Sequence, residues 1–174
     1  LEGNIDKILP RKNVLIRPAS ANVDQALVVF AITQPDPNFN LLDRFLIMML
    51  AQDIPVTICF NKTDLENGAK QQEYRSIYEQ AGYPVMFVST YEKSGVEAVR
   101  DYLRGKTTIL AGPSGVGKSS LTNLLQPEAA METGSISEKI KRGKHTTRHA
   151  ELFCVEEDTY LMDTPGFSSM YLEE

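Results

Sequence analysis

The stretch "GPSGVGKS", residues 112–119, decides the fold class of this 174-residue chain. It fits the pattern G-x-x-x-x-G-K-[ST] without a mismatch, and it stands between the β-branched run 106–112 and the helix-like run 118–125. Glycines let successive backbone N–H groups face an anion, and the N-terminus of a following helix adds partial positive charge. The stretch therefore predicts a phosphate-binding loop between a strand and a helix.

We expect this loop to bind the phosphates of a nucleotide together with Mg²⁺. Lys118 can reach the β- and γ-phosphates, where it would assist catalysis, and the Ser119 hydroxyl can complete the metal shell. The residues expected to touch the nucleotide here are Gly112, Pro113, Ser114, Gly115, Val116, Gly117, Lys118, Ser119 and Ser120. The loop alone does not say which nucleotide binds, because ATPases and small-molecule kinases share it.

A second stretch, "NKTD" (residues 61–64), favours guanine. The Asp64 carboxylate can accept hydrogen bonds from guanine N1–H and the exocyclic amine, whereas adenine has neither donor there. Sites built on such bonds can discriminate by ~10⁴-fold or more. Asn61 would either bond the base edge or brace the loop, and the stem of Lys62 can lie over the base. Thr63 belongs to the same predicted base-binding turn.

A third stretch, "VSTYEKSG", follows the next strand-like run. Ser89 and Thr90 stand where G proteins often place Ser-Ala-Lys, whose backbone N–H reaches guanine O6. Threonine replaces alanine here, but a backbone contact does not depend on the side chain. We therefore expect this turn to complete the guanine site.

The stretch "DTPG", residues 163–166, matches D-x-x-G. Asp163 would hold Mg²⁺ through a water molecule, and the Gly166 N–H would sense the γ-phosphate. A switch threonine is needed between the phosphate loop and this motif, and Thr146 and Thr147 are the candidates. Spacing does not decide which of the two coordinates the metal, and Thr147 is our metal-ligand prediction.

The catalytic water needs an orienting group, because Phe167 stands where many G proteins have a glutamine. We expect His145 to take this role, since a ring nitrogen can orient water and an unperturbed histidine, with a pKa near 6.5, is mostly neutral at cellular pH. The alternative is a solvated loop histidine. His145 lies in the basic run Lys139–Arg148, which is read either as an RNA contact or as a loop that balances the charge of the nucleotide.

Composition fits a single soluble domain, with 42% hydrophobic and 24% charged residues and a net charge of −5. Apolar runs are too short to span a bilayer and neither end carries a secretory or lipidation signal, so a cytoplasmic location without membrane contact is expected. Cys59 and Cys154 lie inside apolar runs without metal-binding spacing. We expect both to be buried thiols, and no zinc site within this chain.

Apolar runs and turn signals predict an α/β fold with a mostly parallel sheet and helices on both faces. The expected strands are 26–33, 55–60, 84–90 and 106–112, with a hairpin of 151–155 and 159–163. The expected helices are 40–52, with Asn40 as N-cap, and 69–82, 95–103 and 118–125. Each motif follows a strand, and ligands of such sheets bind beyond the carboxyl ends of the strands.

The order of the motifs indicates a circular permutation. A conventional G protein begins with the phosphate loop and ends with its guanine-reading turns, whereas here the guanine-reading turns come first. Permutation preserves a site when the original termini lie close together, as they often do. The chain is therefore predicted to be a permuted P-loop G domain.

Six segments carry a specific resemblance: "PRKNVLIRPASANVDQ", "NKTDL", "GPSGVGKSSL", "TGSIS", "RGKHTTRH" and "DTPGF". Together they resemble the circularly permuted, ribosome small-subunit-dependent GTPases of bacteria, the RsgA family. The resemblance implies an N-terminal OB-fold, the GTPase domain, and a C-terminal zinc domain. Residues 1–24 would then be a lead-in from the OB-fold and residues 25–174 the GTPase domain, with zinc bound only in the domain that this chain lacks.

The same resemblance implies GTP hydrolysis in late maturation of the 30S subunit, stimulated by that subunit, with the catalytic histidine of the family at His145. It also implies contact with the small subunit and its ribosomal RNA, for which Lys139–Arg148 is the candidate segment, and we expect the chain to be a monomer. Three alternatives stay open from the sequence. They are a nucleotide-gated binding module with incidental hydrolysis, a permuted GTPase of large-subunit assembly, and a P-loop ATPase or kinase.

Overall fold

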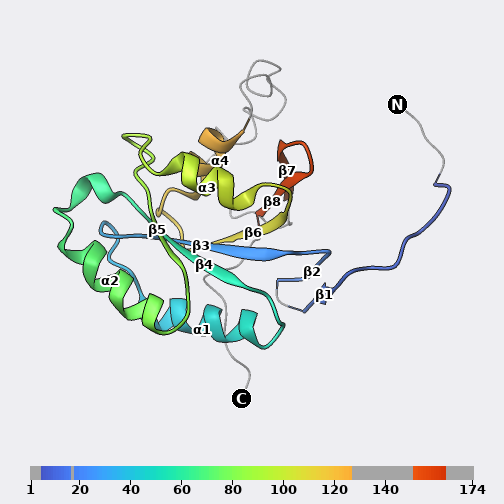
Figure 1. Ribbon diagram of the computed structural model, residues 1–174, viewed down its shortest axis with the longest axis horizontal. Coiled ribbons are helices and arrows are strands. Elements are labelled where there is room, and N and C mark those ends of the chain that lie inside the picture. Colours follow the sequence, from blue (N-terminus) through green and yellow to red (C-terminus); the bar gives the residue numbers. More distant parts are fainter. Residues whose placement is uncertain (1–4, 17, 127–150, 164–174) are drawn as a thin grey trace.

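A six-stranded sheet with helices on both faces forms the body of the protein (Figure 1). The computed structural model describes residues 5–16, 18–126 and 151–163. The sheet has the order β5-β4-β3-β6-β8-β7. Its strands are β3 (Gln25–Ala31), β4 (Val56–Asn61), β5 (Val85–Phe87), β6 (Thr107–Ala111), β7 (Glu151–Glu156) and β8 (Thr159–Asp163). The helices are α1 (Phe39–Leu50), α2 (Ala69–Gln80), α3 (Val96–Leu103) and α4 (Lys118–Leu125), with a short 3₁₀ turn η1 (Thr63–Leu65).

The central strand β3 has every residue buried, as expected for a strand covered on both faces. It pairs in parallel with β4 on one side and with β6 on the other. The β4–β5 and β6–β8 pairs are also parallel, and only β7 pairs in the antiparallel direction, with β8. The predicted α/β fold with a mostly parallel sheet is confirmed.

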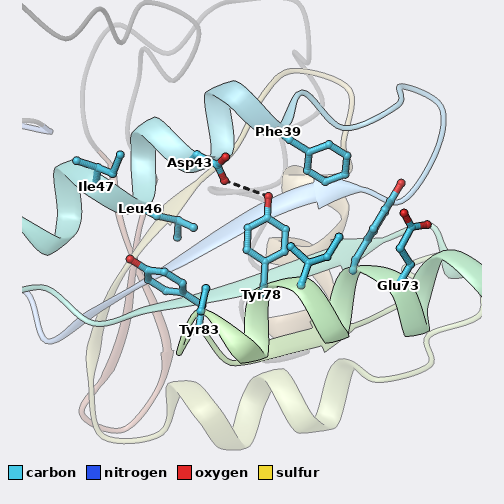
Figure 2. A pocket seen from close by; sticks show the side chains of 10 residues that line it. Phe39, Asp43, Leu46, Ile47, Glu73, Tyr78 and Tyr83 are labelled. Carbon is cyan, nitrogen blue, oxygen red and sulfur yellow. Dashed lines mark hydrogen bonds between the residues drawn. The ribbon is translucent and has the colours of Figure 1, made fainter.

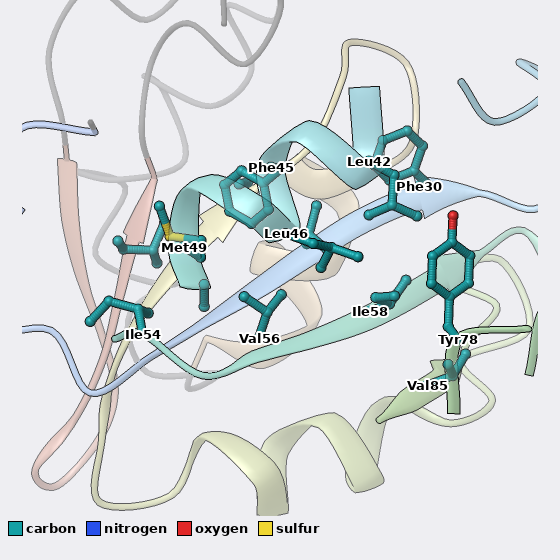
Figure 3. Close-up of a cluster of buried hydrophobic side chains, with 14 of the residues drawn as sticks. Phe30, Leu42, Phe45, Leu46, Met49, Ile54, Val56, Ile58, Tyr78 and Val85 are labelled. Atoms are coloured by element: carbon teal, nitrogen blue, oxygen red, sulfur yellow. The ribbon is translucent and has the colours of Figure 1, made fainter. Parts of the chain in front are cut away.

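Two hydrophobic clusters fill the space between the sheet and its helices. One cluster joins α1 and α2 to one face through residues such as Leu42, Phe45 and Tyr78 (Figure 3). The other joins α3 and α4 to the opposite face through residues such as Val99 and Leu121. Alternate residues of β3 belong to alternate clusters, as the period of a strand requires.

The sheet has a topological switch point between β3 and β6. The neighbouring strands β3 and β6 are hydrogen-bonded, yet β3 leads into α1 on one face and β6 leads into α4 on the other. Two chain segments that leave adjacent strands in opposite directions open a crevice beyond the carboxyl ends of the strands, where ligands of such sheets bind. The predicted phosphate loop follows β6 and so lies at this crevice.

Residues 13–16 and 18–24, which precede β3, pack on the sheet, whereas residues 5–11 are exposed and extend away from it (Figure 1). The packed segment forms a small hairpin of β1 (Val14–Leu15) and β2 (Ser20–Ala21), and Leu15 and Val23 join the cluster beneath α1. The Asp24 carboxylate accepts hydrogen bonds from the Lys12 ammonium and from the Thr107 N–H, 2.8 Å away. Burial alone would raise the pKa of Asp24, but these hydrogen bonds hold it below its ordinary value.

Two local predictions are wrong. The N-cap of α1 is Asn38, not Asn40, because Asn38 has extended backbone angles and its Oδ1 accepts from the Leu41 N–H at 3.1 Å. Cys59 is buried as expected, but Cys154 is exposed. It lies on β7, at the edge of the sheet, where Phe153 and Val155 face the core and Cys154 between them faces outward.

Among the described residues, none of the helices is long and apolar enough to cross a bilayer.

Candidate nucleotide-binding site

The loop between β6 and α4 is held tightly against two neighbouring strands. Gly112 has φ +149°, and a Cβ there would lie 2.1 Å from the carbonyl oxygen of Val29 on β3. Gly117 has φ +94°, and a Cβ there would lie 2.2 Å from Nδ2 of Asn61 at the end of β4. Only glycine fits at these positions, so the glycines of the motif serve packing as well as backbone geometry.

Lys118 begins α4 and folds back over the loop. Its ammonium donates hydrogen bonds to the carbonyl oxygens of Gly112, at 2.6 Å, and Pro113, at 2.8 Å. Burial lowers the pKa of Lys118, and the charge of Asp163 opposes this shift. Ser119 and Ser120 are exposed in the first turn of the helix. A half-buried ammonium over a loop of backbone N–H groups is suited to an anion.

Asn61 connects the three predicted loops. Its side chain is fully buried, and its Nδ2 donates to the Val116 carbonyl oxygen, at 2.8 Å, and to Thr90 Oγ1, at 3.2 Å. Its Oδ1 accepts from the Thr90 N–H at 3.1 Å. The sequence left two roles open for Asn61, a bond to the base edge or a brace of the loop, and in this structure its side chain braces the loops.

Asp64 is positioned by the turn after β5. The buried hydroxyl of Ser89 donates to Asp64 Oδ1 at 2.5 Å, and the same hydroxyl accepts from the Glu92 N–H at 3.0 Å. The Thr63 N–H donates to the Val88 carbonyl oxygen at 3.2 Å, which fixes the base of the Asp64 turn. One carboxylate oxygen is thus directed by a buried donor, at the edge of a hollow that Asp64 shares with Leu65 and Lys70.

The other groups predicted to contact the base, at Lys62, Ser89 and Thr90, all donate hydrogen bonds to protein acceptors in this structure. Lys62 has φ +65°, and its ammonium donates to the Gln34 carbonyl oxygen in the loop after β3. The N–H groups expected to reach guanine O6 both donate within the protein, from Ser89 to Ser94 and from Thr90 to Asn61. Contact of either N–H with a base stays a prediction.

Asp163 ends β8 beside Leu110, so its carboxylate reaches the phosphate-loop side of the sheet. A hydroxyl from Ser119 and a carboxylate from Asp163 are the oxygen ligands that Mg²⁺ prefers. The described residues contain no cluster of three or more His, Cys, Asp or Glu side chains that would hold a metal by themselves. The remaining predicted groups lie outside the described residues: His145, Thr146, Thr147, Gly166 and the run Lys139–Arg148.

Sequence reasoning missed the contacts that hold the loops to one another. These contacts are made by the backbone carbonyl groups of Val29, Gln34 and Val116, and the side chains at these positions do not indicate them. The glycines at 112 and 117 were the only trace of them, because an obligatory glycine indicates close approach of another backbone or side chain.

The fold and these loops define a circularly permuted G domain of the P-loop class, because the guanine-reading turns precede the phosphate loop in the chain but meet it at Asn61. The sequence model of the RsgA GTPase family matches residues 8–173, and the chain therefore belongs to that family.

Curated relatives agree with this assignment. The chain is 64% identical over 168 residues to the small ribosomal subunit biogenesis GTPase RsgA of Agathobacter rectalis, covering 97% of this chain and 56% of that protein. It is 53% identical over 172 residues to the protein of the same name from Alkaliphilus metalliredigens, covering 99% and 59%. The chain thus spans somewhat over half the length of these relatives.

Two solved structures share the fold. The crystal structure of YjeQ from Thermotoga maritima superposes with a TM-score of 0.74 at 31% identity, covering 96% of this chain and 56% of that one. The crystal structure of YloQ, described as a circularly permuted GTPase, gives 0.69 at 38% identity, covering 95% and 52%. The permuted order predicted from the motifs is confirmed.

Proposed function

We propose that this chain binds GTP and GDP with Mg²⁺, hydrolyses GTP, and acts in late maturation of the small ribosomal subunit. The observation that carries the proposal is the buried side chain of Asn61, which ties the phosphate loop to both guanine-reading turns. The names of the relatives support the GTPase activity and the small-subunit role. The alternative of a large-subunit GTPase has no comparable support.

Binding would begin with residues that the structure already orders. The Asp64 carboxylate, held by Ser89, accepts the two guanine N–H donors, and the stem of Lys62 covers the base. The Lys118 ammonium exchanges the carbonyl oxygens of Gly112 and Pro113 for phosphate oxygens. This exchange is favourable because a phosphate compensates a half-buried ammonium better than neutral carbonyl groups do.

Magnesium would be held by Ser119, by Thr147 or its neighbour Thr146, and by Asp163 through water, and it would neutralise charge on the β- and γ-phosphates. His145 would orient the water that attacks the γ-phosphorus, so that the bond to the bridging oxygen breaks and GDP and inorganic phosphate leave. Gly166 would sense the γ-phosphate through its N–H. The competing proposal, a binding switch with incidental hydrolysis, needs no role for His145.

The partner would be the small subunit and its RNA. The run Lys139–Arg148 contains five lysine and arginine residues and no acid: Lys139, Lys141, Arg142, Lys144 and Arg148. Contacts of lysine and arginine with phosphates release counterions, and so weaken with salt. We further propose a monomer in the cytoplasm, with zinc confined to a domain outside this chain.

The test is GTP turnover by the intact protein with and without purified small subunits, at low and moderate salt. We expect stimulation by the subunit that decreases as salt rises. His145→Ala should lose stimulated turnover and keep GDP affinity, whereas His149→Ala, a control at the only other histidine, should keep both. Unchanged turnover in His145→Ala would favour the binding switch, and absence of stimulation would refute the subunit role.

A further inference from the structure

A hollow of about 540 Å³ lies between α1 and α2, on the outer side of the helical layer that covers one face of the sheet (Figure 2). Its floor is aromatic, because Tyr74 and Tyr78 are 7% and 5% exposed and Tyr83 is half-buried. Ile47 and Ile77 line it as well, although they are 55% and 52% exposed. No residue predicted to touch the nucleotide lines this α1–α2 hollow.

The charged residues that line the α1–α2 hollow have one sign, although Lys70 lies near enough to Tyr74 to act on its hydroxyl. Asp43 and Glu73 line it, and among the described residues that line it there is no lysine, arginine or histidine. Asp43 is fixed in place, because the Tyr78 hydroxyl donates to its carboxylate at 3.1 Å (Figure 2). An apolar floor between two carboxylates favours a ligand that is both apolar and cationic.

The two ends of the hollow differ in chemical character. Asp43 precedes Ile47 by one turn of α1, and Glu73 precedes Ile77 by one turn of α2, so each pair shares one helix face. Both helices follow parallel strands and start at the carboxyl end of the sheet. The carboxylates therefore lie toward the nucleotide edge and the isoleucines toward the opposite edge.

We propose that the α1–α2 hollow docks a basic amphipathic segment of a protein of the small ribosomal subunit. The proposal rests on the proposed function and names a protein contact for it. Two apolar side chains of the segment would lie against Ile47, Ile77 and Tyr83, and a lysine or arginine would lie between Asp43 and Glu73. Each helix of 12 residues is ~18 Å long, enough for about three turns of a docked helix.

RNA fits this surface poorly. Phosphates would face two carboxylates, with no cation among the lining residues that the structure describes, whereas RNA-binding surfaces present lysine and arginine. The apolar floor also offers the backbone of RNA no hydrogen-bond donor beyond the tyrosine hydroxyls. A basic protein segment satisfies both the charge and the apolar surface.

The first experiment places the photo-cross-linking residue p-benzoylphenylalanine at position 77 of the intact, GTP-analogue-loaded protein and irradiates it with purified small subunits. The expected product is an adduct that ribonuclease does not shorten and whose partner is identified by mass spectrometry as a protein of the small subunit. An RNA adduct, a cross-link to this protein itself, or no adduct although the protein sediments with the subunit would each overturn the proposal.

A charge variant tests the same contact. Glu73→Lys in the cross-linking protein should lower the yield of the protein adduct by roughly five- to tenfold, because a cation replaces a partner of the bound lysine or arginine. Glu157→Lys makes the same change of charge in the exposed β7–β8 turn and should leave the yield unchanged. Equal yields in both variants would overturn the proposal.

Failure of the proposed function gives a different result. If the intact protein does not bind the small subunit, the subunit role is refuted, and the cross-linking protein is then irradiated with the proteins extracted from that subunit. A Glu73-dependent adduct with one of them would still support the docking surface, and its absence would overturn it. GTP turnover without subunits should be unchanged in Glu73→Lys, because Glu73 is not among the residues assigned to the nucleotide.

Discussion

Replacing Asn61 by alanine should disconnect the guanine-reading turns from the phosphate loop. The substitution removes three hydrogen bonds, to the Val116 carbonyl oxygen, to Thr90 Oγ1 and from the Thr90 N–H. A net contribution of ~1 kcal/mol for each gives ~3 kcal/mol, to which the cost of unpaired buried groups adds. If this energy holds the loops in their binding arrangement, GDP affinity falls by roughly a hundredfold.

The assay is a fluorescence titration with an N-methylanthraniloyl analogue of GDP, together with urea unfolding to confirm that the variant is folded. Asn61→Asp separates hydrogen bonding from packing, because it keeps the shape and the acceptor but loses the donors that face Val116 and Thr90. We expect it to lose as much affinity as Asn61→Ala. The matched control is Asn40→Ala, an exposed asparagine on α1, with unchanged affinity. A folded Asn61→Ala that binds GDP within threefold of the wild type would refute the bracing role.

Three further predictions concern single sites. Gly117→Ala should abolish GDP binding in the same titration, because its Cβ would lie 2.2 Å from Nδ2 of Asn61. Gly82→Ala, outside the predicted nucleotide site and with no atom within 4 Å, should keep GDP affinity and lower the free energy of unfolding by about 1 kcal/mol, the cost of its φ of +88°. Equal losses of GDP affinity would contradict this. A thiol reagent such as 5,5′-dithiobis(2-nitrobenzoate) should label Cys154 quickly and Cys59 slowly. Cys154 is exposed, whereas Cys59 is buried and its burial raises its pKa to about 12. Fast labelling of both thiols in the native protein would contradict the burial of Cys59. Because the pKa of Asp24 is lowered in the native protein, its carboxylate stabilises the fold fully above its ordinary pKa of 3.8 and loses this contribution as the pH falls through the lower native pKa. The free energy of unfolding of Asp24→Asn, measured with urea from pH 2 to 7, should therefore approach that of the wild type in acid. A difference that stays constant over this range would contradict the prediction.

Much of the fold was predictable because its central elements have strong local signals. The β-branched run at β3 is buried throughout and pairs in parallel on both sides, as a strand covered on both faces should. The helix α4 begins and ends at the predicted residues, since a lysine after the last glycine of the loop starts it. The permuted order followed from the sequence of motifs alone.

Other features depend on contacts between distant segments. Asn38 and Asn40 are equally good caps by composition, and only the backbone angles at residue 38 select one of them. Cys154 stands in an apolar run, but the run belongs to an edge strand with one face outward. The sequence placed Asn61 and Ser89 in the predicted guanine site. It did not predict the partners of their side chains, because those partners come from segments far along the chain.

The α1–α2 hollow had no signal in the sequence for the same reason. Each of its two helices shows an ordinary pattern of buried and exposed residues. The isoleucines and carboxylates form one surface only because parallel crossovers place the two helices side by side over β3, β4 and β5. Local periodicity predicts which face of a helix is buried, but not which exposed residues of two helices become neighbours.

The most direct test of the guanine-nucleotide site is competition between guanine and adenine nucleotides for the wild-type protein. The protein is loaded with fluorescent GDP, and unlabelled GDP or ADP is titrated against it in the presence of Mg²⁺. If Asp64, held by Ser89, reads the base, GDP should displace the probe and ADP should need a concentration ~10⁴-fold higher or more. Displacement by ADP at a concentration close to that of GDP would contradict the guanine site.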